Sequence, residues 1–374
     1  MTRIALLQKA RALVVKVGTG VLTGSGGTLD DGVFESIAHD CAKLAAEGRS
    51  VSLVSSGAIG LGWRRLGYPQ KPKTMDALQA SAAAGQGLLI QRWSDALAPH
   101  GRVAAQVLLT HADLADRKRF LNARRALAEL TARGAIPVIN ENDTVSVDEI
   151  AFGDNDALSA QVANLVSADL LVMLSVAPAL LDGEKRVAEV APDDASAEKL
   201  VRSDKSAGGT GGMMTKVKAA RTAAARGTAA MIAAGKEKGV LLRLMAGEDI
   251  GTLFWPSAER LASRAHWIAH TLRPRGVLHL DAGAVEAVRQ SRRSLLPSGI
   301  RDITGSFRQG DAVDLATPDG QVFARGLVVY DAAELKAIRG KRTAEIEAVL
   351  GYHLGDEVVH KDDLVLLDSV KETT

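Results

Sequence analysis

Short runs of apolar, often β-branched residues alternate with longer alanine-rich stretches along the sequence up to about residue 272. Each short run is apolar throughout, as strands are when helices cover both faces of a sheet. Strands separated by helices of this length indicate βαβ units. The sequence therefore predicts an α/β fold with a doubly wound, mainly parallel sheet. The predicted strands are residues 13–17, 51–55, 103–109, 136–140, 170–175 and 229–233.

Two of the stretches between these strands carry apolar residues at the spacing of one helix face. The first has Val33, Ile37, Cys41 and Leu44, and the second has Leu158, Val162 and Leu165.

The pattern changes at the sequence Leu-Arg-Pro-Arg-Gly of residues 272–276. Beyond it the apolar runs are short and separated by turn residues, with one helical stretch at residues 343–350. We expect residues 276–374 to form a small β-rich barrel or sandwich. The predicted domains are residues 1–272 and residues 276–374.

Composition limits the classes of protein to which the chain can belong. Cys41 is the only cysteine, so an intrachain disulfide and a thiolate metal cluster are excluded, and a reducing compartment is expected. No apolar run approaches the roughly 20 residues that cross a bilayer, and the first eleven residues lack a signal peptide's apolar stretch. The formal net charge of +2 excludes a polybasic nucleic-acid coat. We expect a soluble, cytoplasmic protein.

Polar and glycine residues follow several of the predicted strands, where ligands collect in an open parallel sheet. Lys16 stands in the first strand, directly before Gly18-Thr19-Gly20. A lysine in this position either binds an anion or extends along the strand to solvent near a tight turn. The residues at this strand leave both interpretations open.

Ser56 follows the second strand and is succeeded by Gly57. A hydroxyl and bare backbone amides at the start of a helix bind carboxylate or phosphate. Alternatively, Ser56 caps a helix or acts as a hydrolase nucleophile. The nucleophile elbow requires glycine two residues before the serine, and that position is Val54, which argues against a hydrolase.

The fourth strand leads into Asn140-Glu141-Asn142-Asp143, and Gly153-Asp154-Asn155-Asp156 opens the next helix. Such a cluster of carboxylates and amides can orient an ammonium group, or hold lysines and Mg²⁺ in place. Asx turns and a helix cap at Asp154 explain one or two of these residues without a ligand.

Residues 208–216, Gly-Gly-Thr-Gly-Gly-Met-Met-Thr-Lys, are expected to form a loop that cradles phosphate. The loop differs from a Walker A motif because three residues separate its last glycine from Lys216, and no dinucleotide fingerprint follows the first strand. Two lysines on separate glycine loops, with acidic residues between them, suit phosphoryl transfer. The histidines show no metal-ligand spacing and are interpreted as structural or surface residues.

Taken together, these segments resemble the glutamate 5-kinases, a family of the amino-acid-kinase fold that opens proline biosynthesis, and the last hundred residues resemble a PUA domain. The resemblance covers nearly the whole chain. In the kinase part it rests on residues 14–19, 55–59, 119–124, 137–143, 153–156 and 209–213, and in the PUA part on residues 295–300 and 350–352.

The resemblance implies ATP-dependent phosphorylation of the γ-carboxylate of L-glutamate, with Mg²⁺ carried by the nucleotide. That carboxylate, with a pKa of about 4.3, is already ionised at neutral pH, so the reaction requires no general base. The implied catalytic residues are Lys16 and Lys216, which neutralise charge on the transferred phosphoryl group, and Asp156, which holds both lysines. The implied glutamate ligands are Ser56, Asp143 and Asn155, and the implied ATP contacts are Lys16, Ser175, Val176, Thr210, Gly211, Gly212, Met213, Met214, Thr215 and Lys216.

One segment departs from the family pattern. Relatives have Thr-Asp after the fifth strand, where this sequence has Ser175-Val176. Because that segment touches the nucleotide in relatives, we expect a raised KM for ATP. The resemblance also implies feedback inhibition by proline, a homo-oligomer (dimer or tetramer), and glutamyl-phosphate reductase as a possible partner.

Two other functions are compatible with parts of this sequence. One is another carboxylate kinase of the same fold, and the other is an RNA-binding or RNA-modifying protein that acts through the PUA-like domain. Residues 276–374 contain 12 Lys and Arg against 16 Asp and Glu, a net charge of −4. Since affinity for nucleic acid rests largely on cationic contacts, a nucleic-acid partner is not expected.

Overall fold

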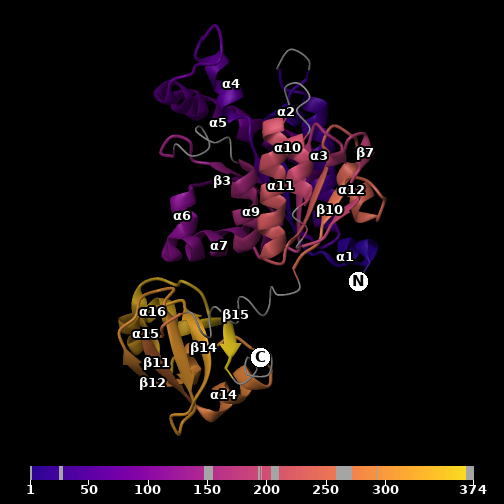
Figure 1. The fold of residues 1–374 in the computed structure, drawn as a ribbon. Coiled ribbons are helices and arrows are strands. Elements are labelled where there is room, and N and C mark those ends of the chain that lie inside the picture. The colour runs from indigo at the N-terminus through magenta and orange to yellow at the C-terminus, as the bar shows by residue number, and fades with distance from the viewer. Residues whose placement is uncertain are drawn as a thin grey trace. The chain divides into compact units, whose positions relative to one another are not determined.

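The chain forms two units, Met1–Ala258 and Glu259–Thr374, and each unit is described by itself (Figure 1). A mainly parallel sheet with β1 (Ala12–Val17) near its centre organises the first unit. The computed structural model describes residues 2–24, 28–146, 155–192, 194, 196–203, 210–257, 272–291 and 293–367. Over these residues the sheet has eight strands, and only the β9–β10 pair is antiparallel. The predicted doubly wound α/β fold is confirmed. In spatial order the strands are β3 (Ala104–Leu109), β4 (Ile136–Glu141), β2 (Ser50–Ser55), β1 (Ala12–Val17), β5 (Leu170–Ser175), β9 (Ala229–Ala234), β10 (Thr252–Phe254) and β8 (Glu189–Val190).

The helices of this unit cover both faces of the sheet and create two hydrophobic cores. Successive residues of a strand point to opposite faces. Along β1, Val15 and Val17 accordingly enter the core beneath α3, α5 and α12, whereas Val14 enters the core beneath α7, α9 and α11. The helices are α1 (Arg3–Lys9), α2 (Thr19–Leu22), α3 (Asp31–Ala46), α4 (Ala58–Arg65), α5 (Met75–Leu97), α6 (His111–Ala115), α7 (Arg117–Ala132), α9 (Asn155–Leu165), α10 (Ser196–Ser203), α11 (Thr210–Ala225) and α12 (Val240–Met245).

The expected helix faces are confirmed, since all seven apolar residues assigned to them are buried on α3 and α9. The six predicted strands each lie within one residue of an observed strand. The sequence did not predict the short strands β8 and β10, or the hairpin of β6 (Leu181–Asp182) and β7 (Lys185–Arg186). Strands of two or three residues are too short to show a periodic pattern.

The second unit is β-rich, as predicted, and has its own core. Its described strands form a five-stranded sheet. Tyr330 is fully buried and donates a hydrogen bond to the carbonyl of Gly355 at 2.6 Å. In spatial order the strands are β12 (Ile300–Gly305), β11 (Gly276–Leu280), β13 (Ala312–Ala316), β14 (Val322–Val328) and β15 (Val359–Leu366), and the helices are α14 (Ala282–Arg289), α15 (Ala332–Ile338) and α16 (Ile346–Leu350).

Among the described residues, none of the helices has the length and apolar character that crossing a bilayer requires.

Two glycines let α4 and α5 approach each other very closely. A Cβ atom at Gly62 of α4 would lie 1.7 Å from the carbonyl oxygen of Ser81 on α5. A Cβ atom at Gly85 of α5 would lie 1.9 Å from the carbonyl oxygen of Ala58 on α4. Backbone atoms on both sides cannot move aside as a flexible side chain can. The contact therefore fixes α5 against the helix that follows Ser56.

We predict that Gly62→Ala lowers the free energy of unfolding by at least about 3 kcal/mol, because overpacking against backbone lies at the upper end of such costs. The matched control is Gly87→Ala on α5, where an added Cβ meets nothing within 4 Å. That control should be neutral or stabilise the protein by up to about 1 kcal/mol. Urea unfolding of both variants tests this, and equal midpoints would contradict it.

Candidate active site

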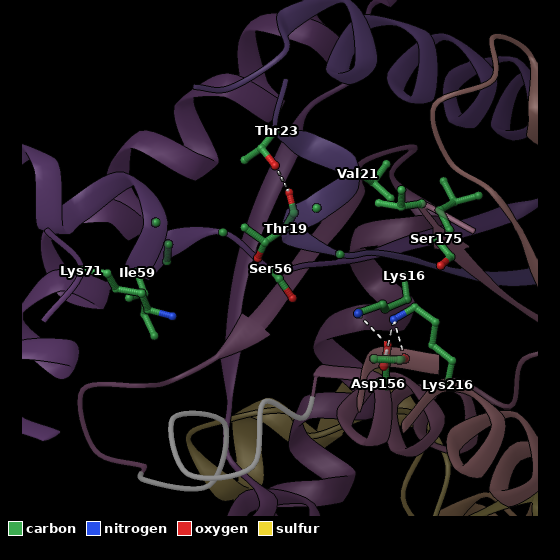
Figure 2. A pocket seen from close by; sticks show the side chains of 18 of the residues that line it. Lys16, Thr19, Val21, Thr23, Ser56, Ile59, Lys71, Asp156, Ser175 and Lys216 are labelled. Carbon is green, nitrogen blue, oxygen red and sulfur yellow. Dashed lines mark hydrogen bonds and ion pairs between the residues drawn. The ribbon is translucent and has the colours of Figure 1, made fainter. Parts of the chain in front are cut away.

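The chain reverses its direction across the sheet between β1 and β5. From β1 it proceeds to β2 and on toward β3 on one side, and it returns to β5 on the other side of β1. Ligands of open α/β sheets bind at such a switch point, outside the carboxyl ends of the strands. A cavity of about 950 Å³ lies there, lined by residues that follow β1, β2 and β5 and by residues of α9 and α11 (Figure 2).

Lys16 is directed toward α9 and α11 by the alternation of β1. It lies two residues after Val14 and so shares that residue's face of the sheet. Its ammonium group is buried and lies 2.6 Å from Oδ1 of Asp156, in the first turn of α9. Lys16 is therefore buried with an acidic partner, and the alternative interpretation, that its side chain extends to solvent, is wrong.

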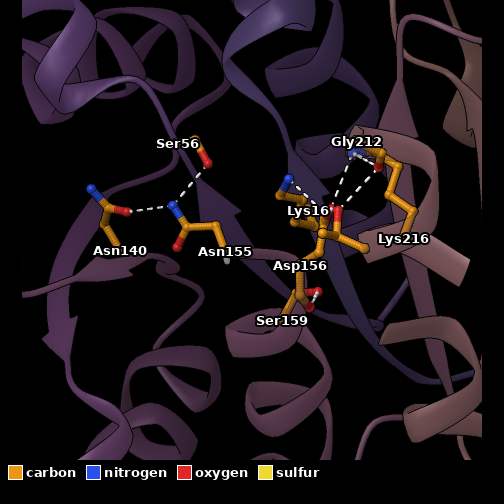
Figure 3. A network of polar contacts seen from close by, with 9 residues as sticks. Lys16, Ser56, Asn140, Asn155, Asp156, Ser159, Gly212 and Lys216 are labelled. Carbon is orange, nitrogen blue, oxygen red and sulfur yellow. Dashed lines mark hydrogen bonds and ion pairs between the residues drawn. The ribbon is translucent and has the colours of Figure 1, made fainter. Parts of the chain in front are cut away.

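The carboxylate of Asp156 lies between two lysines (Figure 3). Its Oδ2 is 3.2 Å from Nζ of Lys216 and accepts a hydrogen bond from the Thr215 hydroxyl at 2.6 Å. Burial disfavours the ionised carboxylate, but the charges of Lys16 and Lys216 and these hydrogen bonds outweigh that effect and hold the pKa of Asp156 below its ordinary value. Asp156 is therefore an anion that binds two cations.

Lys216 belongs to α11 and lies in its second turn. The expected loop over residues 208–216 is wrong from Thr210 onward, because the helix begins at that residue, while Gly208 and Gly209 lie outside the described residues. Met213 and Met214 pack against the second core, and this packing outweighs the low helix propensity of the glycines. Burial, followed by the nearby charge of Lys16, lowers the pKa of Lys216.

An amide network lies beside the lysines. Asn155 precedes Asp156 in α9, and its Nδ2 donates to Oγ of Ser56 at 2.8 Å and to Oδ1 of Asn140 at 3.0 Å (Figure 3). Ser56 lines the cavity, whereas Asn155 and Asn140 are buried behind it. Among the described residues that line this cavity there is no histidine, so these residues offer no histidine base for a hydrolase triad around Ser56.

The turn from β2 into α4 exposes backbone to the cavity. Gly57 has a φ of +125°, which side-chain-bearing residues rarely adopt. It forms the N-cap of α4 without a side-chain hydrogen bond, and Ala58 and Ile59 line the cavity with it. The first amides of a helix attract anions, so this turn presents donors beside Ser56.

The structure brings most of the predicted site residues to one cavity. Asp143, Ser175 and Val176 line it together with the two lysines and Asp156, and Val176 is 63% exposed. Asn155 and Thr215 act behind the lining through hydrogen bonds, Met214 packs in the core, and Thr210 and Gly211 form the start of α11. Asp154, proposed as a helix cap, lies outside the described residues. The lining residues among the predicted set are Lys16, Ser56, Asp143, Asp156, Ser175, Val176, Gly212, Met213 and Lys216.

Sequence reasoning missed the cavity residues that come from α4 and the segment after it. Trp63, Arg64 and Lys71 line the cavity, and Arg64 stacks on the Trp63 ring at 4.5 Å. None of them directly follows a strand, so the rule that located the other residues could not find them. The adjacent cations in residues 63–65 were the available signal.

Comparison with known proteins shows the family of this chain. The model of the amino acid kinase family matches residues 11–234, and that of the PUA domain matches residues 276–350. The chain belongs to the amino acid kinase family. It is 48% identical to glutamate 5-kinase of Myxococcus xanthus over 96% of this chain and 97% of that one. It is 45% identical to the glutamate 5-kinase of a Geobacter species over 98% of this chain and 100% of that one. It is 46% identical to the glutamate 5-kinase of Pseudomonas putida over 96% of this chain and 98% of that one. The resemblance to the glutamate 5-kinases is thereby confirmed.

We predict that Asp156→Asn destabilises the protein by about 3–5 kcal/mol at pH 7, because it leaves two ammonium groups without their buried partner. The folded-state pKa of Asp156 is lowered, so its stabilising effect is complete above the unfolded-state pKa of about 3.9 and is lost as pH falls through the folded-state value. The difference between the wild type and the variant should therefore shrink at acidic pH.

Urea unfolding at a series of pH values measures this difference. The control is Asp31→Asn, which breaks an exposed pair with Arg92 and should cost less than about 1 kcal/mol. A pH-independent difference for Asp156→Asn would contradict the assignment of an ionised carboxylate.

Proposed function

We propose that this protein transfers the γ-phosphoryl group of ATP to the side-chain carboxylate of L-glutamate, forming L-glutamyl 5-phosphate in the first step of proline biosynthesis. One observation carries the proposal: a buried lysine, Lys16, and a largely buried one, Lys216, share one carboxylate at the switch point of a chain that matches glutamate 5-kinases over nearly its full length. The kinase site is assigned to residues 1–272, and residues 276–374 form the appended PUA-like domain.

The main difficulty of this reaction is electrostatic, because a carboxylate must approach a polyphosphate. Catalysis of phosphoryl transfer consists largely of positioning and charge stabilisation. Lys16 and Lys216 supply two positive charges where the phosphoryl group passes, and Asp156 keeps these charges in fixed positions. The acceptor carboxylate is ionised at neutral pH, so no residue has to remove a proton.

The cavity offers different chemistry to the two substrates. We assign Ser56, Asp143 and Asn155 to glutamate: the Ser56 hydroxyl suits a carboxylate of the substrate, Asp143 suits its ammonium group, and Asn155 acts through its hydrogen bond to Ser56. We assign the lining from Ser175 and Val176 to Gly212 and Met213, with the first turns of α11, to ATP. Mg²⁺ carried by the nucleotide would neutralise charge on its phosphates.

The regulation and assembly of the protein are part of the same proposal. We expect proline to inhibit it, a homo-oligomer to form, and the acyl phosphate to pass to glutamyl-phosphate reductase in the cytoplasm. An acyl phosphate hydrolyses readily, which favours rapid consumption of the product by the next enzyme.

Trapping of the acyl phosphate tests the proposed function. Incubation with glutamate, ATP, Mg²⁺ and hydroxylamine should give γ-glutamyl hydroxamate, which ferric chloride detects. Aspartate and N-acetylglutamate serve as alternative acceptors in parallel reactions. Absence of the hydroxamate with folded protein would reject the proposal, and a better alternative acceptor would reject glutamate as the substrate.

We predict that Lys216→Ala lowers kcat by about 10²-fold or more, with a smaller effect on the KM for glutamate. Loss of one preorganised electrostatic donor has this magnitude. The matched control is Lys218→Ala, two residues further along α11, where the side chain is exposed and outside the cavity lining. A normal kcat for Lys216→Ala would remove this lysine from the mechanism.

We predict that Val176→Asp lowers the KM for ATP several-fold and leaves the KM for glutamate nearly unchanged. The substitution restores the acidic side chain that relatives place here, and a hydrogen bond to a ligand contributes about 0.5–1.5 kcal/mol. Val103→Asp, at a valine that is 67% exposed and outside the cavity lining, is the control. An unchanged or higher KM for ATP would show that a neighbour such as Asp182 or Glu184 has taken over the contact.

A further inference from the structure

Helix α5 reaches Ser56 through two separate chains of hydrogen bonds. The first begins at Trp93, which is fully buried and whose Nε1 donates to Oγ of Ser55 at 2.8 Å. The Ser55 hydroxyl in turn donates to the carbonyl oxygen of Ser56 at 3.3 Å. An indole nitrogen can only donate, so the direction of this chain is determined by its first member. The chain fixes the backbone of Ser56.

The second chain fixes the side chain of Ser56. It begins at Gln86, two turns before Trp93 on α5, whose Oε1 accepts a hydrogen bond from Nδ2 of Asn140 at 2.8 Å. Oδ1 of Asn140 accepts from Nδ2 of Asn155 at 3.0 Å, and the same Nδ2 donates to Oγ of Ser56 at 2.8 Å. Asn155 is therefore the donor on both of its sides: it donates to Ser56, and it donates to Asn140, which in turn donates to Gln86.

The orientation of the Asn155 amide determines what Ser56 offers to the cavity. A serine hydroxyl has one hydrogen to donate and lone pairs with which to accept. Because Asn155 occupies a lone pair of Ser56, the hydroxyl hydrogen of Ser56 remains available to donate toward the cavity that Ser56 lines. If the Asn155 amide were turned over so that its Oδ1 faced Ser56, Ser56 would donate to Asn155 and would present a lone pair to a carboxylate, which would repel it.

Both chains begin on helix α5, which close packing holds in place. The Gly62–Gly85 contact fixes it against α4, and the ring of Trp93 packs on Phe34 with their centroids 4.7 Å apart. The Nε2 atom of Gln86 is buried and has no hydrogen-bond partner in the described part of the chain. Only the carbonyl end of Gln86 therefore takes part in the chain.

We propose that Gln86 is a positioning residue for the acceptor substrate: its carbonyl orients Asn140 and Asn155 so that the Ser56 hydroxyl donates a hydrogen bond to an acceptor carboxylate. The inference rests on the proposed function for the identity of that acceptor, L-glutamate. Gln86 lies outside the cavity lining. Its effect is on binding of the acceptor, and not on ATP binding or on the phosphoryl-transfer step.

Steady-state kinetics of Gln86→Met test this assignment, because methionine has a similar shape and cannot hold the Asn140 amide. The KM for glutamate should rise about 3- to 10-fold, the factor for one lost hydrogen bond, while kcat and the KM for ATP change less than about twofold. Gln91→Met is the matched control on α5, where Gln91 donates to Asp95 on the exposed surface, and should match the wild type. Equal glutamate KM values for Gln86→Met and the wild type would overturn the proposal.

Gln86→Glu distinguishes positioning from packing. A glutamate side chain keeps an acceptor for Asn140 and replaces only the Nε2 group, which has no partner, so its KM for glutamate should stay within about twofold of the wild type. If Gln86→Glu and Gln86→Met raise this KM equally, the orientation of the amides is not what matters and the proposal fails. Should Gln86→Met not fold, Gln86→Lys, which can only donate, takes its place and should raise the same KM.

A double-mutant cycle with Ser56→Ala shows whether Gln86 acts through Ser56. In the Ser56→Ala background, Gln86→Met should no longer change the affinity for glutamate, and an undiminished effect would overturn the proposal. Calorimetric titration of each protein with L-glutamate gives this affinity without turnover. A wild type that binds glutamate and forms no hydroxamate would reject the proposed function alone, whereas an active wild type matched by Gln86→Met would reject the positioning role alone.

Discussion

The ionised carboxylate of Asp156 is the interaction on which the site depends. It lies between two ammonium groups that are both largely withdrawn from water, and a buried charge is stable only when it is paired. Without it, Lys16 and Lys216 would repel each other at the point where the two substrates have to meet. The carboxylate thus turns two mutually repelling cations into a fixed pair of charges.

The alternation of strand side chains decides which helices contribute to the site. Lys16 and Ser56 lie two residues after Val14 and Val54, and so share the face of the sheet that α9 and α11 cover. Lys16 contacts Asp156 of α9, and Ser56 contacts Asn155 of the same helix. The side chains of Ser55 and Asn140 point to the opposite face of the sheet. There Ser55 contacts Trp93 of α5, and Asn140 contacts Gln86 of the same helix. One edge of the sheet therefore has its charged cluster on the side of α9 and α11, and further hydrogen-bonding support from α5 on the other side.

The two groups of residues serve different demands of the same reaction. The lysines and Asp156 address charge, which requires fixed positions and burial. The amide network addresses recognition, which requires that each hydroxyl and amide point in one direction. Neighbouring residues of α9, Asn155 and Asp156, join the two groups, so a displacement of the first turn of α9 would disturb both at once.

The sequence alone determined the α/β class, the six longer strands, and the residues at the carboxyl ends of those strands that line the cavity. A strand buried on both faces has to be apolar throughout, and parallel strands necessarily bring their carboxyl ends to one edge. The start of α11 at Thr210, the contact between Gly62 and Gly85, and the approach of Gln86 to Asn140 were decided only by the tertiary structure. These features depend on how helices far apart in the sequence pack together, and local propensity and spacing carry no information about that packing because its energy comes from contacts between distant residues.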